Sequence, residues 1–456
     1  MNPDFTHTIV ALATPSGVGA IGVIRVSGPD TIAVVNGLFK GKDLTTAATH
    51  TIHFGTIRDG NTLVDEVLVS LFRGPHSYTR EDVIEISCHG STYIIQKIIR
   101  LLLLQGTRLA KPGEFTQRAF LNGRFDLAQA EAVADLIASE NETAHRAAIS
   151  QMRGGFSIEI KKLREELIHF ASLIELELDF SEEDVEFASR DNLRQLIDHL
   201  LLAIQGLLDS FAVGNVIKNG VPTVIAGKPN AGKSTLLNAL LNEEKAIVSD
   251  IAGTTRDIIE DEIIIQGVHF RFIDTAGIRE TEDQIEKIGV ERTHTKMREA
   301  SLILYMVDLS VETEPEIHRQ IEHLDSLRIP FVMVGNKIDK AGQALRHTLA
   351  ADDRFVFISA LSKENLEILK TKILEITNLD SFRTGNTIVT NARHYESLMQ
   401  TREALRQVID GIGHHVTSDF LALDIRHALS HLGEITGEIT TDDLLENIFS
   451  KFCIGK

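Results

Sequence analysis

The 456-residue sequence predicts a multidomain protein in which α/β domains are combined with an all-α part. The length corresponds to about three domains at roughly 150 residues each. Apolar, β-branched runs alternate with helical periodicity near the start and again after residue 220, whereas helical periodicity alone fills the regions between and after them. Hydrophobic residues make up 43% and charged residues 24%, a balance that argues against disorder over most of the length.

The composition excludes several classes of protein. A formal net charge of −19 argues against coating nucleic acid by bulk charge, although it leaves a local basic site open. Two cysteines, Cys88 and Cys453, are too few for a disulfide scaffold or a Cys-rich zinc site, and they suit a reducing compartment. The start lacks the basic and apolar regions of a secretory signal, and the apolar stretch Ile98–Leu104 is too short to span a bilayer. We therefore expect a cytoplasmic protein that does not enter a membrane.

The first domain, expected over residues 1–119, has mixed α/β character. A glycine loop, Thr14-Pro-Ser-Gly-Val-Gly19, separates two β-branched runs and predicts a strand on each side of it. Apolar residues at helical spacing predict a helix over Ser91–Leu104. The predicted strands are Thr8–Leu12, Gly19–Val26, Val64–Phe72 and Asp82–Ser87.

A helical domain is predicted in two pieces, residues 120–214 and 381–456, on either side of a second α/β domain at 215–380. Such an insertion is physically easy because chain termini and insertion points usually lie at exposed surfaces. Leu127–Ser150 contains neither Pro nor Gly and predicts one long helix. Thr441 precedes two acids and is a typical helix N-cap. The other predicted helices are Phe156–Phe180, Asn192–Phe211, Arg393–Ile412, Ser418–Leu432 and Asp442–Phe452.

An acidic stretch, Glu165–Glu186, lies inside the first helical piece. Nine acids and no Lys or Arg fall between Arg164 and Arg190. The stretch is either a solvated helix face followed by a charged turn, or a docking surface for a basic partner. Both interpretations remain open on sequence alone.

The inserted domain is predicted to contain a doubly wound, mostly parallel sheet, because short apolar strands alternate with helical stretches. One hairpin is expected, where Gln266-Gly267 provides the turn. Asn215–Pro222 is interpreted as a linker. The predicted strands are Thr223–Ala226, Glu262–Ile265, Phe270–Ile273, Leu302–Val307, Phe331–Val334 and Phe355–Ile358.

A phosphate-binding loop is predicted at Gly227–Ser234. Its sequence, GKPNAGKS, matches G-x-x-x-x-G-K-[ST] between a predicted strand and a helix, which is the context that the pattern requires. The glycines let backbone N–H groups converge on phosphate oxygens, and the following helix N-terminus attracts the same anion. Lys233 is expected to reach the β- and γ-phosphates, and the Ser234 hydroxyl to bind Mg²⁺.

Two further motifs predict that the nucleotide is GTP. Asp274-Thr-Ala-Gly277 has the D-x-x-G form, in which Asp274 would hold Mg²⁺ through water and the Gly277 N–H would meet the γ-phosphate. Asn336-Lys-Ile-Asp339 has the N-K-x-D form, and Asp339 can accept hydrogen bonds from the guanine N1–H and 2-amino group, a pair that adenine lacks. Ser359-Ala360 would support the guanine O6 by a backbone N–H. The order of these motifs predicts a Ras-like P-loop GTPase domain.

The residue after D-x-x-G indicates a different catalytic arrangement. Many GTPases carry Gln there to orient the attacking water, and an arginine finger supplies positive charge. Here the residue is Ile278, so another group, such as a carboxylate within Arg279–Glu286, must orient the water. A monovalent cation could replace the finger, because Asn230 offers a side-chain oxygen and Ser249–Thr255 offers backbone carbonyls. Asn230 is explained equally well as a turn-forming residue, and Thr255 is the natural second Mg²⁺ ligand.

The motifs resemble those of a known family. With Asp250–Asp257 (DIAGTTRD), Ile273–Glu280 (IDTAGIRE) and the terminal Phe452–Lys456 (FCIGK), the sequence resembles the bacterial tRNA modification GTPases of the MnmE (TrmE) family. The likeness runs end to end and includes Pro112–Arg124 and Gly433–Leu445. It implies an N-terminal domain, similar to folate-binding one-carbon domains, that forms a homodimer and binds 5-formyltetrahydrofolate or a related tetrahydrofolate.

The resemblance also implies a reaction and a partner. With the flavoprotein MnmG, in a heterotetramer, the family adds a carboxymethylaminomethyl or aminomethyl group to C5 of the wobble uridine (U34) of certain tRNAs. GTP hydrolysis is needed for that reaction and is stimulated when the G domains pair across the dimer with K⁺ bound. MnmG is then a candidate partner for the acidic stretch Glu165–Glu186.

Residue roles follow from the same resemblance. Glu286 matches the family's catalytic glutamate, and Lys233 is the catalytic lysine of the phosphate loop. Cys453 lies in the C-terminal motif credited with a role in modification, although a small buried apolar residue is an equal interpretation. The implied GTP-binding residues are Asn230, Ala231, Gly232, Lys233, Ser234, Thr235, Ser249, Thr254, Thr255, Asp274, Thr275, Ala276, Gly277, Asn336, Lys337, Asp339, Ser359 and Ala360. The implied Mg²⁺ ligands are Ser234 and Thr255, the K⁺ ligands are Asn230, Ser249, Ile251 and Thr254, and the folate contacts are Arg25, Glu85, Arg124 and Lys456.

Two other functions remain open. The chain could be a GTPase switch in ribosome assembly or translation that takes no part in chemistry, or a one-carbon transfer enzyme in which GTP is only regulatory. The folate-like N-terminal region and the C-terminal C-I-G-K favour tRNA modification over a ribosomal switch, because such switches lack both.

Overall fold

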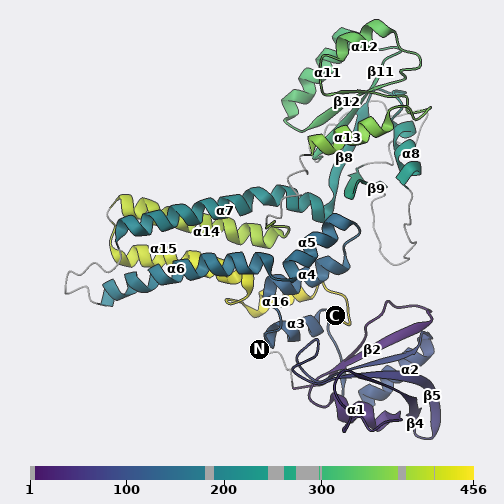
Figure 1. Ribbon diagram of the computed structural model, residues 1–456, viewed down its shortest axis with the longest axis vertical. Helices are drawn as coiled ribbons and strands as arrows, with labels where there is room; N and C mark the ends of the chain where they lie inside the picture. Colours follow the sequence, from purple (N-terminus) through teal and green to yellow (C-terminus); the bar gives the residue numbers. More distant parts are fainter. Residues whose placement is uncertain are drawn as a thin grey trace. The chain divides into compact units, whose positions relative to one another are not determined.

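The structure, a computed structural model, describes residues 6–179, 189–244, 261–273, 297, 300–377, 387–414 and 416–456, with the main chain only at 179, 242–244 and 343–344. The chain forms two compact units. The first comprises Met1–Ala138, Ala148–Leu201 and Ser397–Lys456, and the second comprises Ser139–Ala147 and Leu202–Glu396. Figure 1 labels their helices and strands.

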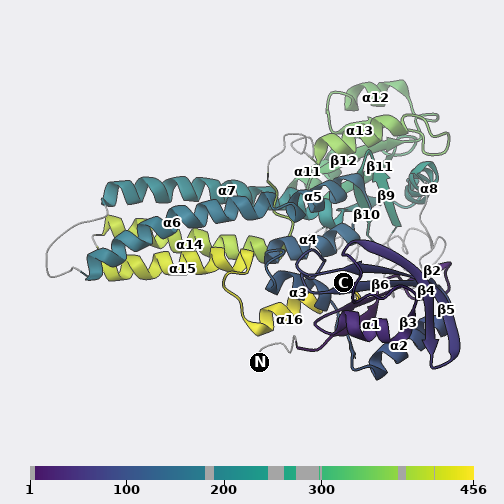
Figure 2. The same cartoon turned by 60° about the horizontal axis from the view of Figure 1, so that its bottom comes forward.

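A seven-stranded sheet with the order β3-β4-β5-β6-β2-β1-β7 forms the N-terminal part of the first unit (Figure 2). Neighbouring strands are antiparallel except β1 and β7, which are parallel. Helices α1 (Thr31–Leu38) and α2 (Thr92–Leu104) share one hydrophobic core with the sheet, so both pack on the same face. The strands are β1 (Ile9–Leu12), β2 (Ile21–Ser27), β3 (Phe39–Lys40), β4 (Thr51–Asp59), β5 (Thr62–Phe72), β6 (Val83–His89) and β7 (Arg108–Leu109).

The strands and the helix predicted for this region are confirmed, but the sequence pattern did not predict α1 or β4. Helix α1 is rich in β-branched residues and contains Gly37, all weak helix formers, so packing on the sheet must stabilise it. In β4 the apolar Ile52 and Phe54 face solvent, whereas Gly55 and Ile57 face the core. That pattern gives no clear hydrophobic alternation from which a strand is recognised.

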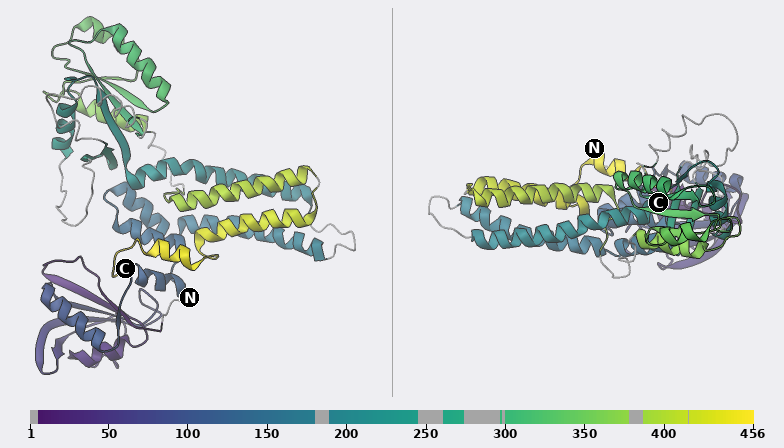
Figure 3. Two further views of the ribbon diagram at one scale, coloured as in Figure 1. Left: turned by 180° about the vertical axis from the view of Figure 1, so that it is seen from behind. Right: turned by 90° about the horizontal axis from the view of Figure 1, so that it is seen from above.

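The rest of the first unit is helical. Helix α6 (Gly155–Asp179) lies beside α15 (Ser418–Thr436). The ion pair Arg426–Glu175 joins the two helices, and Arg164 of α6 pairs with Glu438, two residues beyond α15. Figure 3 shows α6 and α15 running side by side. Helix α16 (Asp442–Phe449) packs on α3 and α4, and the Thr441 hydroxyl accepts the Leu444 N–H, which confirms the predicted cap. Helices α3 (Glu114–Leu121) and α4 (Leu127–Ile137) also belong to this unit, whereas α5 (Glu142–Met152), α7 (Arg190–Asn219) and α14 (Ala392–Gly413) each pass from one unit into the other.

The single helix predicted over Leu127–Ser150 is wrong, because α4 and α5 are separate. Asn141 caps α5 by accepting the Ala144 N–H at 2.8 Å. Ser139 and Asn141 are residues whose side chains compete with helical hydrogen bonds, and here that local competition outweighs the general helix propensity of the stretch.

Two acids of the stretch Glu165–Glu186 have partners within the first unit. Glu175 pairs with Arg426, and the buried Glu177 pairs with Arg190, each at 2.9 Å. Residues 180–188 lie outside the described residues. These two acids therefore contribute to the packing of the helices in the first unit.

Helix α7 is long and apolar enough, by length and composition alone, to cross a membrane. This is weak evidence, because core helices of soluble proteins pass the same test. Its buried Leu193, Ile197, Leu200 and Ile204 recur every three or four residues, which is the pattern of a bundle helix with one apolar face.

The second unit contains a six-stranded sheet with the order β13-β12-β11-β8-β10-β9. All neighbouring strands are parallel except β9 and β10. One core joins the sheet to α8 and α13, and a second joins it to α11 and α12, so helices cover both faces. The elements are β8 (Val221–Gly227), β9 (Asp261–Ile265), β10 (Val268–Phe272), β11 (Leu302–Asp308), β12 (Phe331–Asn336), β13 (Phe355–Phe357), α8 (Lys233–Glu244), α11 (Glu314–Leu327), α12 (Gln343–Leu349) and α13 (Leu366–Ile376). The predicted doubly wound domain, inserted between α7 and α14, is confirmed.

The hairpin predicted at Gln266-Gly267 is confirmed. Both residues have positive φ, 47° and 84°, as a two-residue turn of type I′ requires. The linker predicted over Asn215–Pro222 is wrong, because α7 continues to Asn219 and β8 begins at Val221. Ile217 is buried, so this segment packs as part of the fold although its Asn and Gly residues are typical of a loop.

Candidate functional site

The phosphate-binding loop follows β8 and leads into α8, as the sequence predicts. Gly227 has a φ of 142°, and a Cβ added there would lie 2.4 Å from the Met306 carbonyl oxygen. Gly232 has a φ of 103°, and its Cβ would lie 2.3 Å from Asn336 Nδ2. Both positions therefore require glycine, and the loop leads into the N-terminus of α8, the end of a helix that attracts anions.

The Lys233 side chain lies over the loop. Its Nζ donates to the carbonyl oxygens of Gly227, at 3.0 Å, and Lys228, at 2.9 Å. Burial lowers the pKa of Lys233, since the charged ammonium is partly removed from water. An anionic group beside the ammonium would compensate for that loss of solvation.

The residues predicted for base recognition lie against the same loop. Asn336 donates from Nδ2 to the Ala231 carbonyl at 2.8 Å, and its Oδ1 accepts the Ala360 N–H at 3.0 Å. Asp339 accepts the Ser359 hydroxyl at 3.0 Å. The buried Asn336 thus connects the phosphate loop to the segment that carries Ser359 and Ala360.

Lys337 forms a second connection between the two ends of the site. Its Nζ donates to the Asn230 carbonyl at 2.9 Å and to Asp308 Oδ2 at 2.5 Å. Burial alone would raise the pKa of Asp308, but hydrogen bonds from Lys337 and Ser310 hold it below its ordinary value. Asp308 therefore stays ionised beside Lys337.

Asn230 has a φ of 60°, a left-handed conformation that Asn tolerates better than most residues, so its role as a turn former is evident. Ser234 and Thr235 lie in the first turn of α8. The remaining predicted ligands lie outside the described residues: Ser249, Ile251, Thr254, Thr255, Asp274, Thr275, Ala276, Gly277 and the catalytic Glu286.

A cavity of about 550 Å³ opens in the N-terminal part of the first unit. Arg25, Glu85 and Arg124, three of the four predicted folate residues, line it. Arg25 donates from Nε to Glu85 Oε1 at 2.9 Å. The guanidinium groups of Arg25 and Arg124 lie 5.2 Å and 5.1 Å from the centre of the Tyr78 ring. The cavity therefore combines two cations, a carboxylate and an aromatic face.

Tyr78 and Arg80 also line the cavity and were not predicted. They lie in the irregular segment between β5 and β6, where no motif marks them. An Arg and a Tyr within a loop that contains Gly74-Pro75 were the available signal, but such residues are common in surface loops.

Lys456, the fourth predicted folate residue, is not among the described residues that line the cavity. Its neighbour Gly455 accepts a hydrogen bond from Arg25 Nη1 at 3.1 Å. Gly455 has a φ of 93°, and an added Cβ would lie 2.3 Å from the Leu12 carbonyl oxygen. The C-terminal tail is thus packed against the end of β1, one residue away from the cavity.

Cys453 is exposed, which contradicts its interpretation as a small buried apolar residue. Its carbonyl oxygen accepts the Gly113 N–H at 3.4 Å, so the backbone of the tail is held although the thiol faces solvent. Cys88, by contrast, is buried, and burial raises its pKa to about 11.

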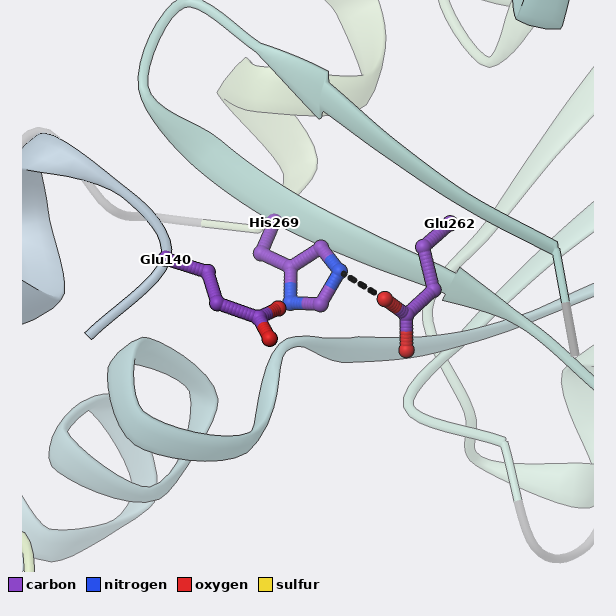
Figure 4. A group of neighbouring side chains, drawn as sticks. All are labelled: Glu140, Glu262 and His269. Carbon is purple, nitrogen blue, oxygen red and sulfur yellow. Dashed lines mark ion pairs between the residues drawn. The ribbon is translucent and has the colours of Figure 1, made fainter. Parts of the chain in front are cut away.

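Glu140, Glu262 and His269 place potential metal-binding atoms within 4.8 Å of one another in the second unit. Figure 4 shows the Glu140 carboxylate on one side of the imidazole ring and the Glu262 carboxylate on the other. His269 Nε2 lies 3.3 Å from Glu262 Oε2, a distance that also suits an ordinary ion pair. We assign no metal to this group.

Comparisons with known proteins match the chain along its whole length. The family described as "GTP-binding protein TrmE N-terminus" matches residues 8–124, and "MnmE helical domain" matches residues 127–453. The tRNA modification GTPase MnmE of Cytophaga hutchinsonii is 60% identical over 453 residues, which cover 99% of this chain and 98% of that protein. The proteins of the same name from Christiangramia forsetii and Flavobacterium johnsoniae are 54% and 55% identical and cover 98% of this chain and 99% of their own lengths.

Among solved structures, the G domain of the T. maritima FeoB iron transporter is 27% identical and covers 35% of this chain and 99% of its own. Its TM-score of 0.26 is too low to support an argument. The assignment rests instead on the sequence identity and on the two matched families, which follow one another along the chain. The chain belongs to the MnmE (TrmE) family of tRNA modification GTPases.

Proposed function

We propose that this member of the family is a K⁺-dependent, dimerisation-activated GTPase that acts with the flavoprotein MnmG on tRNA. That it is a GTP hydrolase of tRNA modification follows from the family to which it belongs. The proposed reaction adds a carboxymethylaminomethyl or aminomethyl group to C5 of the wobble uridine, with a one-carbon unit from a tetrahydrofolate. The proposed domains are 1–119, the helical pieces 120–214 and 381–456, and the GTPase domain 215–380.

The hydrogen bonds of Asn336 and Asp339 support the proposed specificity for guanine. Asn336 links the phosphate loop at Ala231 to the Ala360 N–H, and Asp339 is hydrogen-bonded to Ser359 in the same corner. The base and phosphate ends of the site are therefore held in fixed relation. A carboxylate at Asp339 accepts from the two adjacent donors of guanine, whereas adenine presents no such pair.

The residues of the phosphate end fit a nucleotide with Mg²⁺. On phosphate binding, the Lys233 ammonium would leave the carbonyls of Gly227 and Lys228 for the β- and γ-phosphates. Ser234, at the start of α8, and Thr255 would hold Mg²⁺, which neutralises charge on the phosphates. Asn230, Ser249, Ile251 and Thr254 are the proposed K⁺ ligands, all of them oxygen donors suited to a hard cation.

Glu286 is the proposed catalytic residue, which orients the attacking water. Its assignment rests on the resemblance and on Ile278, a side chain that cannot bind water at the usual position of Gln. K⁺ would supply the positive charge that an arginine finger supplies in other GTPases.

The proposed folate site is the cavity beside Tyr78. Its volume, about 550 Å³, lies within the usual range for small-molecule sites. Arg25 and Arg124 suit the carboxylates of the folate glutamate, and Glu85 can accept from the N–H donors of the pterin. Lys456, next to the Gly455 that accepts a hydrogen bond from Arg25, is the fourth proposed contact.

Homodimerisation is supported by the outer face of the N-terminal sheet. Ile52, Phe54 and Leu68 are large apolar side chains that are about half or more exposed, and Phe54 is paired directly with Leu68 across β4 and β5. An apolar sheet face of this kind is typical of an interface. It lies opposite the face that α1 and α2 cover.

GTP turnover in K⁺ and in Na⁺ tests the proposed mechanism. We expect turnover to rise strongly in K⁺, because Na⁺ is too small for the same shell of oxygen ligands. Glu286→Ala should retain nucleotide binding and lose most of the turnover. Equal rates in the two salts would exclude the proposed role of the cation, and a near wild-type rate for Glu286→Ala would exclude that residue as the catalytic one.

A further inference from the structure

Lys228, a variable position of the phosphate loop, makes contacts that the loop motif does not require. Its Nζ lies 3.1 Å from Glu312 Oε2 and 3.2 Å from Glu316 Oε1. Glu316 lies in the first turn of α11, and Glu312 lies just before that helix. The side chain therefore ties the start of the loop to the connection between β11 and α11.

Glu312 is buried, with only 3% of its side chain exposed. Its Oε1 accepts the Asp308 N–H and its Oε2 accepts Gln320 Nε2, each at 2.9 Å. A buried carboxylate needs a compensating cation, because charge is costly to remove from water. Lys228 supplies it. Burial alone would lower the pKa of Lys228, but the hydrogen bonds to Glu312 and Glu316 raise it, so the lysine stays charged.

These contacts form a ring that includes part of the phosphate loop. Lys228 pairs with Glu312, Glu312 accepts from Asp308, Asp308 pairs with Lys337, and Lys337 donates to the Asn230 carbonyl. Both ends of the segment 228–230 are thus attached to the end of β11. Lys337 thus gives a second connection between the phosphate loop and the base-recognition motif, in addition to the one through Asn336.

We propose that Lys228 is a positioning residue for the bound nucleotide, acting through Glu312 to hold the phosphate loop in its binding conformation. The inference rests on the proposed GTP site. Its physical basis is the buried Glu312, to which the Lys228 side chain attaches the start of the loop. Gly227 is also paired with Met306 of β11, so the Lys228 side chain is a second attachment at this end of the loop.

An ordinary surface ion pair would contribute little, typically below about 1 kcal/mol. Lys228 is 42% exposed and by itself resembles a residue of a surface ion pair. Glu312, however, is buried, and loss of Lys228 would leave its carboxylate without a cation. The effect of changing Lys228 should therefore depend on Glu312, whereas a plain surface pair would show little such dependence.

The test is a titration of the full-length chain with a fluorescent GDP, with Mg²⁺ present. Lys228→Met should raise the dissociation constant about tenfold, which corresponds to 1.4 kcal/mol. Lys228→Arg should restore near wild-type affinity, because Arg reaches the same carboxylates. In a Glu312→Gln background, Lys228→Met should have an effect of less than about threefold, since the buried charge is gone.

Lys372→Met provides the matched control. Lys372 also pairs with two acids, Asp353 and Glu375, but on α13, away from the loop. It should bind GDP as the wild type does. The thermal midpoint of each nucleotide-free variant shows whether the unit remains folded.

If the wild type binds GDP and Lys228→Met binds GDP with the same affinity, this inference is overturned and the proposed function is not. An equal loss in Lys228→Met and Lys228→Arg, or an undiminished loss in the Glu312→Gln background, would also overturn it. Failure of the wild type to bind GDP would overturn the proposed function, and the inference with it.

Discussion

Arg118 on α3 has a fully buried side chain, and its replacement tests how the first unit is held together. The guanidinium donates to both carboxylate oxygens of Glu81 at 3.1 Å, to Glu114 Oε1 at 3.1 Å and to the His7 carbonyl at 2.9 Å. It thereby connects α3 with the segment before β6 and with the residue that leads into β1. Arg118→Met keeps much of the buried volume but removes the charge and these hydrogen bonds.

The expected magnitude follows from the partners that stay behind. Glu114 keeps Arg108, at 2.5 Å, and Glu81 keeps the Ser27 hydroxyl, at 2.7 Å. Breaking a buried ion pair costs about 3–5 kcal/mol. Because Glu114 retains one cation, we expect the free energy of unfolding to fall by about 3 kcal/mol, the lower end of that range.

Urea unfolding of the full chain, combined with hydrogen exchange of the β1 and β6 amides, measures the effect. Arg146→Met is the control, because Arg146 pairs with Glu142 on α5 where both side chains are 75% exposed. It should leave the exchange of β1 and β6 unchanged. A loss of stability in Arg118→Met no larger than that of the control would refute the reasoning.

The same variant has an expected pH dependence. Burial alone would raise the pKa of Glu114, but Arg108, the Lys111 N–H and Arg118 together hold it below its ordinary value. A depressed carboxyl pKa stabilises the fold above the pKa of the unfolded state, and that contribution is lost as pH falls through the folded value. The difference between wild type and Arg118→Met should therefore be full near neutral pH and shrink below about pH 4.

Three further outcomes are expected. Lys233→Ala should weaken GTP binding itself by about 100-fold, because it removes a charged donor to the phosphates; calorimetry measures this, and unchanged affinity would contradict the role. Gly455→Ala should displace the C-terminal tail, since its Cβ would meet the Leu12 carbonyl at 2.3 Å, and should weaken 5-formyltetrahydrofolate binding; equal affinity would exclude a role for the tail. Iodoacetamide at pH 8 should label the exposed Cys453 but not the buried Cys88, whose pKa is raised to about 11. Peptide mass spectrometry locates the label, and labelling of Cys88 rather than Cys453 would contradict the expectation.

The position of the phosphate loop between β8 and α8 was predictable from the sequence, because its glycines act through local backbone geometry. Gly227 and Gly232 are fixed by positive φ and by close approach to neighbouring atoms, and such requirements leave a readable spacing in the chain. The hairpin at Gln266-Gly267 was predictable for the same reason, since a turn of two residues with positive φ restricts which residues occupy it.

Features that depend on long-range contacts were not predictable. Whether Asn215–Asn219 ends a helix or forms a linker is decided by the burial of Ile217, which local composition does not encode. The pairing of Lys228 with Glu312 joins positions 84 residues apart, and neither belongs to a fixed motif position. Tyr78 and Arg80 gain significance only when the fold brings Arg25 and Arg124 beside them.

The central claim is that the chain acts in modification of the wobble uridine of tRNA. Nucleoside analysis of tRNA from a strain that lacks this chain tests it most directly, with the wild-type chain and Glu286→Ala each supplied in return. We expect the C5-modified wobble uridines to disappear, to return with the wild-type chain and to stay absent with Glu286→Ala. Unchanged wobble uridines in the deletion strain would contradict the account and favour a GTPase switch that takes no part in the chemistry.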